Sequence, residues 1–388
     1  MNRFFFLITA LFPLFLFSIN VDKSVVKVET HLQMYTGEPW ESSSIGRGMA
    51  SGFVVASNQV VTNAHGVSHA THIRVKLPGS TKSYPAIIKV IGDDCDLALL
   101  QVDDPEFARY SEPVSFAEVQ DGDEVTVIGF PLPYHTLSYT KGIVSSSYHK
   151  VYQHSGAYLS AIQIDAAVNM GNSGGPVVHH GKVVGVAFGK IGGLAVDNIC
   201  FMIPTSLVKH FLREASQGKY QGFPRLGMTF QPLIHPDLRR YLDLNDETTG
   251  VMIVDAADYE ELQEGDILTR IDDIPLNNDG SIYVDGARKD LFFYVFLQKH
   301  LGDTVKLQIL RNQIRKDLHI SIHQAFNHTP SHARLSYYIY AGLVFDSFQD
   351  ANDAKDTLYL RKVLAHPVNV GYQDLQNCEV VKIGSKQE

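Results

Sequence analysis

Short hydrophobic runs of β character follow one another along the chain from about residue 47 to residue 204. Gly, Asp, Asn and Pro separate these runs at close spacing, and no long stripe with the 3.6-residue period of a helix lies between them. The runs are SGFVVAS, QVVTNAH, HIRVKL, AIIKVIG, DLALLQV, DEVTVIGF, YLSAIQID, PVVHHGKVVGVAFG and NICFMIP. Short strands joined by tight turns predict an antiparallel barrel or sandwich, so the fold class is mainly β.

The pattern changes to a helical period at Thr205. In the segment TSLVKHFLREAS, four apolar side chains fall on one face: Leu207, Val208, Phe211 and Leu212. This spacing predicts an amphipathic helix that closes a first domain over residues 21–218.

Two further units are expected after this domain. The segment QGKYQGFP, residues 217–224, is polar and contains Gly and Pro, which indicates a linker. Mixed strand and helix patterns over 222–325, with an amphipathic helix near 290–299, predict a small α+β domain. Residues 330–388 end without a closing element, so we expect an incomplete domain there.

The first 20 residues have the pattern of an export signal. Arg3 precedes an apolar run from Phe4 to Phe17. This run is shorter than the roughly 20 residues that span a bilayer and contains Pro13, so a permanent anchor is the weaker alternative. We therefore expect a periplasmic or secreted protein, membrane-associated if the signal segment 1–20 is retained.

Composition excludes one class of partner. The chain of 388 residues is 45% hydrophobic and has a formal net charge of −9 without a basic tract, so nucleic acid is not expected to bind. The three cysteines, Cys95, Cys200 and Cys378, are odd in number and lie in separate apolar contexts. They are interpreted as buried free thiols. A nucleophilic Cys95 is a less favoured alternative to a packing role.

The strongest local motif is GNSGGP, residues 171–176. A serine that attacks a carbonyl needs a tight turn whose backbone N–H groups point at the developing oxyanion, and glycines permit such a turn. Ser173 is the expected nucleophile, and the N–H groups of Gly171 and Ser173, with Asn172 between them, are the expected oxyanion hole. The alternative is a Gly-rich hairpin with an incidental serine.

A serine hydroxyl needs a base, and the base needs a carboxylate that holds its tautomer. His65 lies at the end of the β-like run VVTNAH, although a lone histidine is more often a surface or core residue. Asp96 heads the apolar run LALL, whereas Asp93 and Asp94 lie in the preceding polar turn. Without the other two motifs, Asp96 would be interpreted as an ordinary residue at the start of a strand. His69 with His72, or His179 with His180, lacks the motif of a metal site, so no metal or other cofactor is expected.

The order His65, Asp96, Ser173 is that of the chymotrypsin-type barrel. The motifs TNAH, DLAL and GNSGGP, followed by the second unit, resemble the HtrA/Deg family of trypsin-like serine proteases over about residues 25–325. The resemblance implies a chymotrypsin-like double β-barrel, ATP-independent cleavage of unfolded polypeptides in protein quality control, and assembly into homotrimers or their multiples. The stretch 35–47 is short for the regulatory loop of some members.

Substrate specificity is expected from residues beside the nucleophile. Val168 would form one wall, and the residues along the bound peptide would be Ala187, Phe188 and Gly189. No acidic pocket base is evident, so small or medium apolar P1 residues are expected. For Asp165, the nearest acid, a structural hydrogen-bonding role is favoured over a specificity role.

The family resemblance extends to the second unit. Its segment Arg225-Leu226-Gly227-Met228 resembles the loop with which PDZ domains bind a C-terminal carboxylate, although Arg225 departs from the motif. The following segment GVMIVDAADYEELQEGDILTRIDDIPL looks like the middle of a PDZ domain, and residues 330–388 resemble part of a second one. C-terminal peptide tails are therefore expected partners.

Two alternative functions are compatible with parts of this pattern. The first is a chaperone or peptide-binding protein that holds unfolded clients with little cleavage, which the complete triad argues against. The second is a serine esterase, disfavoured because a G-x-S-x-G elbow on an α/β pattern is missing.

Overall fold

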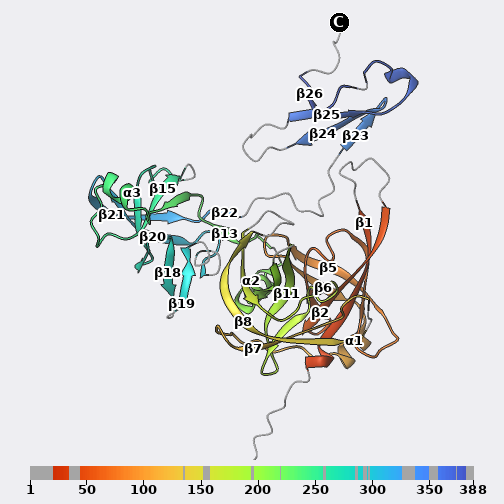
Figure 1. The fold of residues 1–388 in the computed structure, drawn as a ribbon. Helices are drawn as coiled ribbons and strands as arrows, with labels where there is room; N and C mark the ends of the chain where they lie inside the picture. Colours follow the sequence, from red (N-terminus) through yellow and green to blue (C-terminus); the bar gives the residue numbers. More distant parts are fainter. Residues whose placement is uncertain are drawn as a thin grey trace, which may run out of the picture.

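A computed structural model describes residues 21–34, 44–133, 136–151, 158–193, 196–218, 220–256, 259–284, 287–291, 295, 298–325, 337–348, 357–372 and 374–381. The export signal expected at 1–20, and most of the stretch 35–47, lie outside these ranges. Along the chain, two β-barrels are followed by a second unit with its own sheets and a third with one sheet (Figure 1).

The first barrel is a closed antiparallel sheet in the order β1-β2-β3-β6-β5-β4. A short 3-10 turn, Val21–Lys23, precedes it, and helix α1, Pro105–Tyr110, follows it. The strands are β1 Val25–Met34, β2 Ser44–Ala56, β3 Gln59–Thr62, β4 Ala70–Lys76, β5 Tyr84–Gly92 and β6 Leu97–Val102. Inward-facing side chains such as Val26, Val54 and Val75 are fully buried inside the barrel.

The second barrel is closed in the order β10-β11-β12-β9-β8-β7. Its strands are β7 Glu124–Gly129, β8 Ser138–Val151, β9 Tyr158–Ile164, β10 Pro176–His179, β11 Lys182–Gly193 and β12 Val196–Pro204. The double β-barrel expected from the sequence is thereby confirmed.

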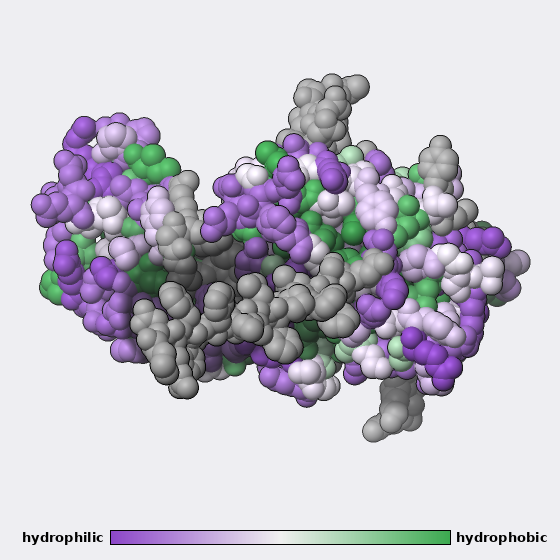
Figure 2. Space-filling model, turned by 90° about the horizontal axis from the view of Figure 1, so that it is seen from below, coloured by the Kyte–Doolittle hydropathy of each residue, from purple (hydrophilic) through white to green (hydrophobic). Residues whose placement is uncertain are grey.

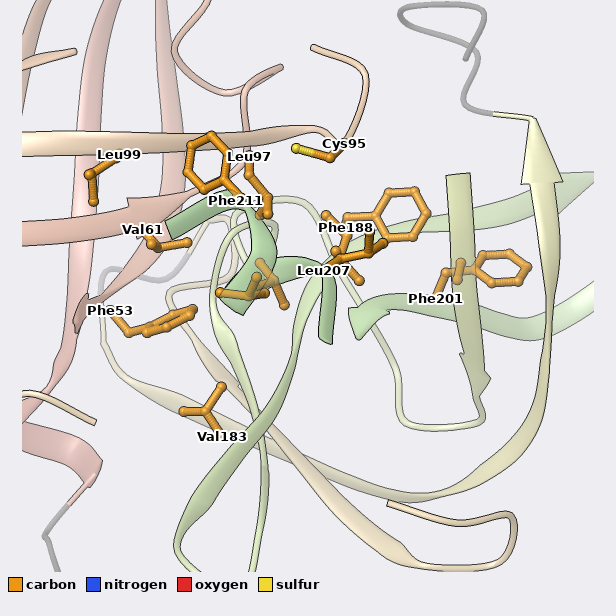
Figure 3. Close-up of a cluster of buried hydrophobic side chains, with 14 of the residues drawn as sticks. Phe53, Val61, Cys95, Leu97, Leu99, Val183, Phe188, Phe201, Leu207 and Phe211 are labelled. Atoms are coloured by element: carbon orange, nitrogen blue, oxygen red, sulfur yellow. The ribbon is translucent and has the colours of Figure 1, made fainter. Parts of the chain in front are cut away.

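Helix α2, Thr205–Ser216, covers the seam between the barrels. Its apolar face carries Leu207, Val208 and Phe211, all fully buried, with Leu212 partly buried, as the sequence predicts. These side chains share one cluster with residues of both barrels, such as Phe53 of β2 and Phe201 of β12 (Figure 3). Burial of this cluster joins the barrels into one domain.

The second unit contains a sheet in the order β14-β15-β16-β20-β21, with β17 beside β16. Of the described residues in the helix expected near 290–299, Leu291, Val295 and Gln298 have helical backbone, whereas Asp290 ends β19 and Lys299 lies outside regular structure. The elements are β13 Pro224–Arg225, β14 Thr229–Pro232, α3 Pro236–Tyr241, β15 Val251–Asp255, β16 Ile267–Ile271, β17 Ile274–Pro275, β18 Ser281–Val284, β19 Ala287–Asp290, β20 Thr304–Arg311, β21 Ile314–Ser321 and β22 Gln324–Ala325.

The third unit is an antiparallel sheet in the order β23-β24-β25-β26, with a short 3-10 turn, Pro367–Asn369. The strands are β23 Tyr337–Tyr340, β24 Leu343–Phe348, β25 Thr357–Val363 and β26 Cys378–Glu379. Val344 and Val363 are buried, whereas all four side chains of β23 are exposed. The described part of this unit is a thin sheet with little core.

The surface is mixed in character. Figure 2 shows hydrophilic residues over much of the face in view, with hydrophobic residues in smaller patches between them. Among the described residues, no helix combines the length and the apolar character needed to cross a bilayer.

Candidate active site

His65 and Asp96 form a close pair in the first barrel. His65 follows β3, and Asp96 immediately precedes β6, which pairs with β3. Nδ1 of His65 lies 2.8 Å from Oδ2 and 3.1 Å from Oδ1 of Asp96, and the backbone N–H of His65 donates to Oδ1 at 2.9 Å. Asp96 is completely buried, and both of its carboxylate oxygens face His65, an arrangement that can hold the imidazole in one orientation.

The backbone of Asp96 is held by the turn that carries the histidine. Its carbonyl accepts hydrogen bonds from the Ala64 N–H at 3.1 Å and from Nδ2 of Asn63 at 3.0 Å. Asn63 is fully buried. This contact could not be read from the motif TNAH, because its partner lies about thirty residues away.

The electrostatic environment favours a charged imidazole. Burial would lower the pKa of His65, but the negative charge of Asp96 and the hydrogen bond to it outweigh burial, so the pKa of His65 lies above 6.5. The side chain of His65 is 31% exposed, so the base remains accessible from solvent.

The turn around Ser173 lies against the strand that leads to His65. Gly171 has φ +98° and Gly174 has φ +84°, in the left-handed region that favours glycine. A Cβ on Gly174 would come within 2.9 Å of the backbone nitrogen of Asn63, so only glycine permits this approach. Ser173 is half-buried at the edge of the turn.

Two backbone N–H groups of this turn are available to a ligand. The carbonyl of Met170 accepts a hydrogen bond from the Leu132 N–H at 2.7 Å. Because a trans peptide directs its C=O and N–H to opposite sides, this bond turns the Gly171 N–H away from Leu132. Within the described part of the chain, neither the Gly171 N–H nor the Ser173 N–H donates to a backbone carbonyl. The arrangement can stabilise an oxyanion.

Ser51 of β2 connects the nucleophile turn to both barrels, and the sequence analysis did not select it. Its hydroxyl donates to the Gly171 carbonyl at 2.7 Å and accepts from the Phe130 N–H at 2.8 Å. Its backbone N–H donates to the Ser173 carbonyl at 2.8 Å. Ser51 is completely buried. In the run SGFVVAS it looks like any strand residue, so only the tertiary structure identifies it.

Of the expected substrate-binding residues, Gly189 is partly exposed, whereas Ala187 is completely buried and its two backbone groups are already bonded within the protein, so neither is left to bind a peptide. The Ala187 N–H donates to the Gly175 carbonyl at 2.9 Å, and the Ala187 carbonyl accepts from the Gly174 N–H at 2.7 Å. A Cβ on Gly189 would meet no atom within 4 Å. Of these two residues, only Gly189 has open space beside its backbone.

Val168 and Phe188 are buried, with 4% and 5% exposure, and belong to hydrophobic clusters. The Val168 N–H contacts Sγ of Cys200 at 3.3 Å. By contrast, Met170 is 76% exposed and immediately precedes Gly171. Sequence reasoning did not select Met170, whose side chain is accessible from solvent whereas that of Val168 is buried.

Three acidic residues differ in role. Oδ1 of Asp165 accepts from the Ile143 N–H at 2.5 Å, in agreement with a structural role. Asp93 and Asp94, expected in a polar turn, are both buried. They lie in a turn, as the sequence predicts, and other segments of the chain cover this turn.

The cysteines are free, but they are not all buried. Cys95 and Cys200 are buried as expected, whereas Cys378 is exposed. The prediction for Cys378 was wrong because β26 is a short strand of the thin third sheet, and the residues on either side, Asn377 and Glu379, are polar and exposed.

The expected carboxylate loop lies between β13 and β14. Arg225 is exposed, while Leu226 and Met228 are buried in the core of the second unit. Strand β14, which begins at Thr229, forms the edge of its sheet and pairs only with β15 among the described strands. An edge strand after a short loop is the geometry in which an extended peptide can add to a sheet.

One group of potential metal ligands occurs among the described residues, at a cavity of about 260 Å³ beside α2. Oε1 of Glu214 lies 3.3 Å from Nδ1 of His300, and the rings of His210 and His300 stack at 4.8 Å with 18° between their planes. A bound metal lies in the plane of each imidazole ligand, so two stacked rings cannot both bind one ion. The group is a contact between α2 and the second unit.

Comparisons with known proteins all identify serine proteases as similar to this chain. The sequence model described as a trypsin-like peptidase domain matches residues 50–186. "Protease Do-like 4, mitochondrial" of Arabidopsis thaliana is 36% identical over 393 residues, covering 96% of this chain and 75% of that protein. "Protease Do-like 2, chloroplastic" of the same plant is 34% identical, covering 92% and 65%. The solved HtrA-type protease AlgW with a tripeptide is 23% identical, with a TM-score of 0.61 over 78% of this chain and 94% of that one, which shows a common fold.

Proposed function

Because the chain belongs to the HtrA/Deg family of trypsin-like serine proteases, we propose that it is an endopeptidase that cleaves unfolded or damaged polypeptides in protein quality control. The observation that carries the proposal is the His65–Asp96 pair beside a turn with two available N–H donors and a half-buried serine. Cleavage by this group of residues requires no ATP.

The proposed chemistry follows from these positions. Nε2 of His65 takes the proton of the Ser173 hydroxyl while Oγ attacks the peptide carbonyl, and Asp96 stabilises the resulting imidazolium. The N–H groups of Gly171 and Ser173 bind the oxyanion of the tetrahedral intermediate. His65 then gives its proton to the leaving amine, and water hydrolyses the acyl-enzyme by the same route.

The substrate class is tested by digestion of an unfolded protein. Reduced casein should be cleaved at many sites, and mass spectrometry of the product ends should show small or medium apolar P1 residues. Met170 offers an apolar surface beside the oxyanion hole, and Asp165, the acidic residue nearest in sequence to Val168, bonds to the Ile143 N–H. Cleavage mainly after Lys and Arg would contradict the expected preference for apolar P1 residues.

The pH profile should reflect the raised pKa of His65. Only the neutral imidazole accepts a proton, so kcat/KM should rise with pH through a midpoint above 6.5. The measurement is kcat/KM for a fluorogenic peptide between about pH 5 and 9. A midpoint below 6.5 would show that Asp96 does not support the base.

We further propose that the second unit, residues 222–325, is a PDZ-like domain that binds C-terminal peptide tails at Arg225–Met228 and β14. A peptide ending in apolar residues should bind the intact chain, and its C-terminally amidated twin should lose most affinity, because amidation removes the charge that backbone N–H groups meet. Calorimetric titration measures both peptides. Equal affinities would mean that the loop is an ordinary turn.

Three further proposals follow from the family resemblance and from the sequence pattern. The chain forms homotrimers or multiples of them, which light scattering after size-exclusion chromatography measures. Residues 330–388 are a partial second PDZ-like segment with a packing or assembly role, which removal of the segment and the same measurement would test.

Residues 1–20 act as an export signal, as N-terminal sequencing of the mature protein would reveal. Relatives carry names that place them in mitochondria, chloroplasts or a periplasm, compartments reached across a membrane.

A further inference from the structure

Asp94 is a buried carboxylate that the proposed chemistry does not use. It is 5% exposed and lies two residues before Asp96. Its Oδ1 accepts a hydrogen bond from the Tyr220 hydroxyl, and its Oδ2 accepts one from the Phe223 N–H at 2.7 Å. Burial raises the pKa of Asp94 even though both hydrogen bonds favour the charged form. A buried acid near a catalytic group indicates a specific task.

Both donors come from the segment expected to be a linker. The ring of Tyr220 packs edge-on against Phe211 of α2 at 5.4 Å, and its hydroxyl lies 3.5 Å from Sγ of Cys95. Phe223 is fully buried, and its ring stacks on that of His210 at 4.6 Å. Residues 220–223 are therefore bound to the barrel domain and lie over the turn that contains Asp94.

That turn has little room for adjustment. A Cβ on Gly92 would lie 2.7 Å from the Tyr220 hydroxyl and 2.8 Å from Sγ of Cys95, so the tyrosine approaches the backbone closely. The Cys95 N–H closes the turn on the Gly92 carbonyl at 3.4 Å. Because Gly92 has no side chain, the Tyr220 hydroxyl can lie this close to the backbone of the turn.

Asp96 itself has φ +54°, a conformation that a residue with a side chain rarely adopts and that its surroundings must maintain. On its C-terminal side, Ala64 and Asn63 hold its carbonyl, and β6 begins. On its N-terminal side, the turn from Gly92 to Cys95 is held by residues 220–223.

We propose that residues 220–223 are a positioning element of the active site, in which the Tyr220 hydroxyl and the Phe223 N–H hold Asp94 and thereby fix the turn that presents Asp96 to His65. This inference rests on the proposed role of the triad. It means that residues 220–223, which lie outside both barrels, affect the catalytic base His65.

The test is Tyr220→Phe in the full chain, which removes the hydroxyl and keeps the ring that packs on Phe211. We expect kcat for a fluorogenic peptide to fall about tenfold with little change in KM. The midpoint of the pH profile should also move downward, because Asp96 is the group that raises the pKa of His65. Asp94→Asn should produce the same two changes.

Tyr84→Phe is the matched control, because Tyr84 is a buried tyrosine of the same barrel at the other end of β5 from Gly92. It should leave kcat and the pH midpoint unchanged. The proposal is overturned if Tyr220→Phe and Asp94→Asn keep the wild-type values, or lose activity without a shift of the midpoint. Ser173→Ala separates the failure of this inference from the failure of the proposed triad. Activity retained in that variant would refute the triad itself.

Discussion

Ser173→Ala is expected to lower kcat for peptide hydrolysis by about a millionfold, the loss typical of removing the nucleophile from a serine-protease triad. The loss is large because the variant has no atom that can form the acyl-enzyme, and what remains is the contribution of the oxyanion hole and of substrate binding. The measurement is digestion of reduced casein and of a fluorogenic peptide by wild type and variant at equal concentration.

Ser24→Ala is the matched control for this experiment. Ser24 is a fully buried serine just before β1, away from the GNSGGP turn in sequence, and its removal should leave kcat unchanged. Cleavage by Ser173→Ala within tenfold of wild type would disprove the assignment of the nucleophile. If wild type and Ser173→Ala both bound unfolded casein equally and neither cleaved it, the chaperone function would replace the protease.

Asp96→Asn is expected to lower kcat by about ten-thousandfold. The side chain has nearly the same shape, but its amide can donate a hydrogen bond to Nδ1 of His65 and so favour the tautomer in which Nε2 carries the proton. A protonated Nε2 cannot accept the proton of Ser173. The variant also loses the negative charge that raises the pKa of His65.

Two measurements check this expectation: kcat at the pH optimum of the wild type, and the midpoint of the acid limb, which should move downward. Asp165→Asn is the control, because Asp165 is exposed and bonds to the Ile143 N–H of the second barrel. An Asp96→Asn variant with more than a tenth of wild-type kcat would show that another group orients the imidazole.

Local pattern was sufficient for most strands of the barrels, for α2 and for the candidate triad, but β1 and β8 were not among the predicted runs. Short apolar runs separated by Gly, Asp and Asn predict strands and turns of the barrels. Helix α2 coincides with TSLVKHFLREAS because its apolar face follows the helical period. His65, Asp96 and Ser173 each lie in a short motif whose residue types the chemistry requires. Such signals are contained within a few neighbouring residues.

The tertiary structure decided whatever depends on residues far apart in the chain. It placed Asp96 against His65, Ser51 beneath the Ser173 turn, and Tyr220 on Asp94, a contact across 126 positions. No periodicity encodes such contacts, because they arise only when both barrels and α2 have packed. For the same reason Asp94 is buried although it is a charged residue in a turn, whereas Cys378 is exposed on a short strand of the third sheet: burial depends on which other segments cover a residue.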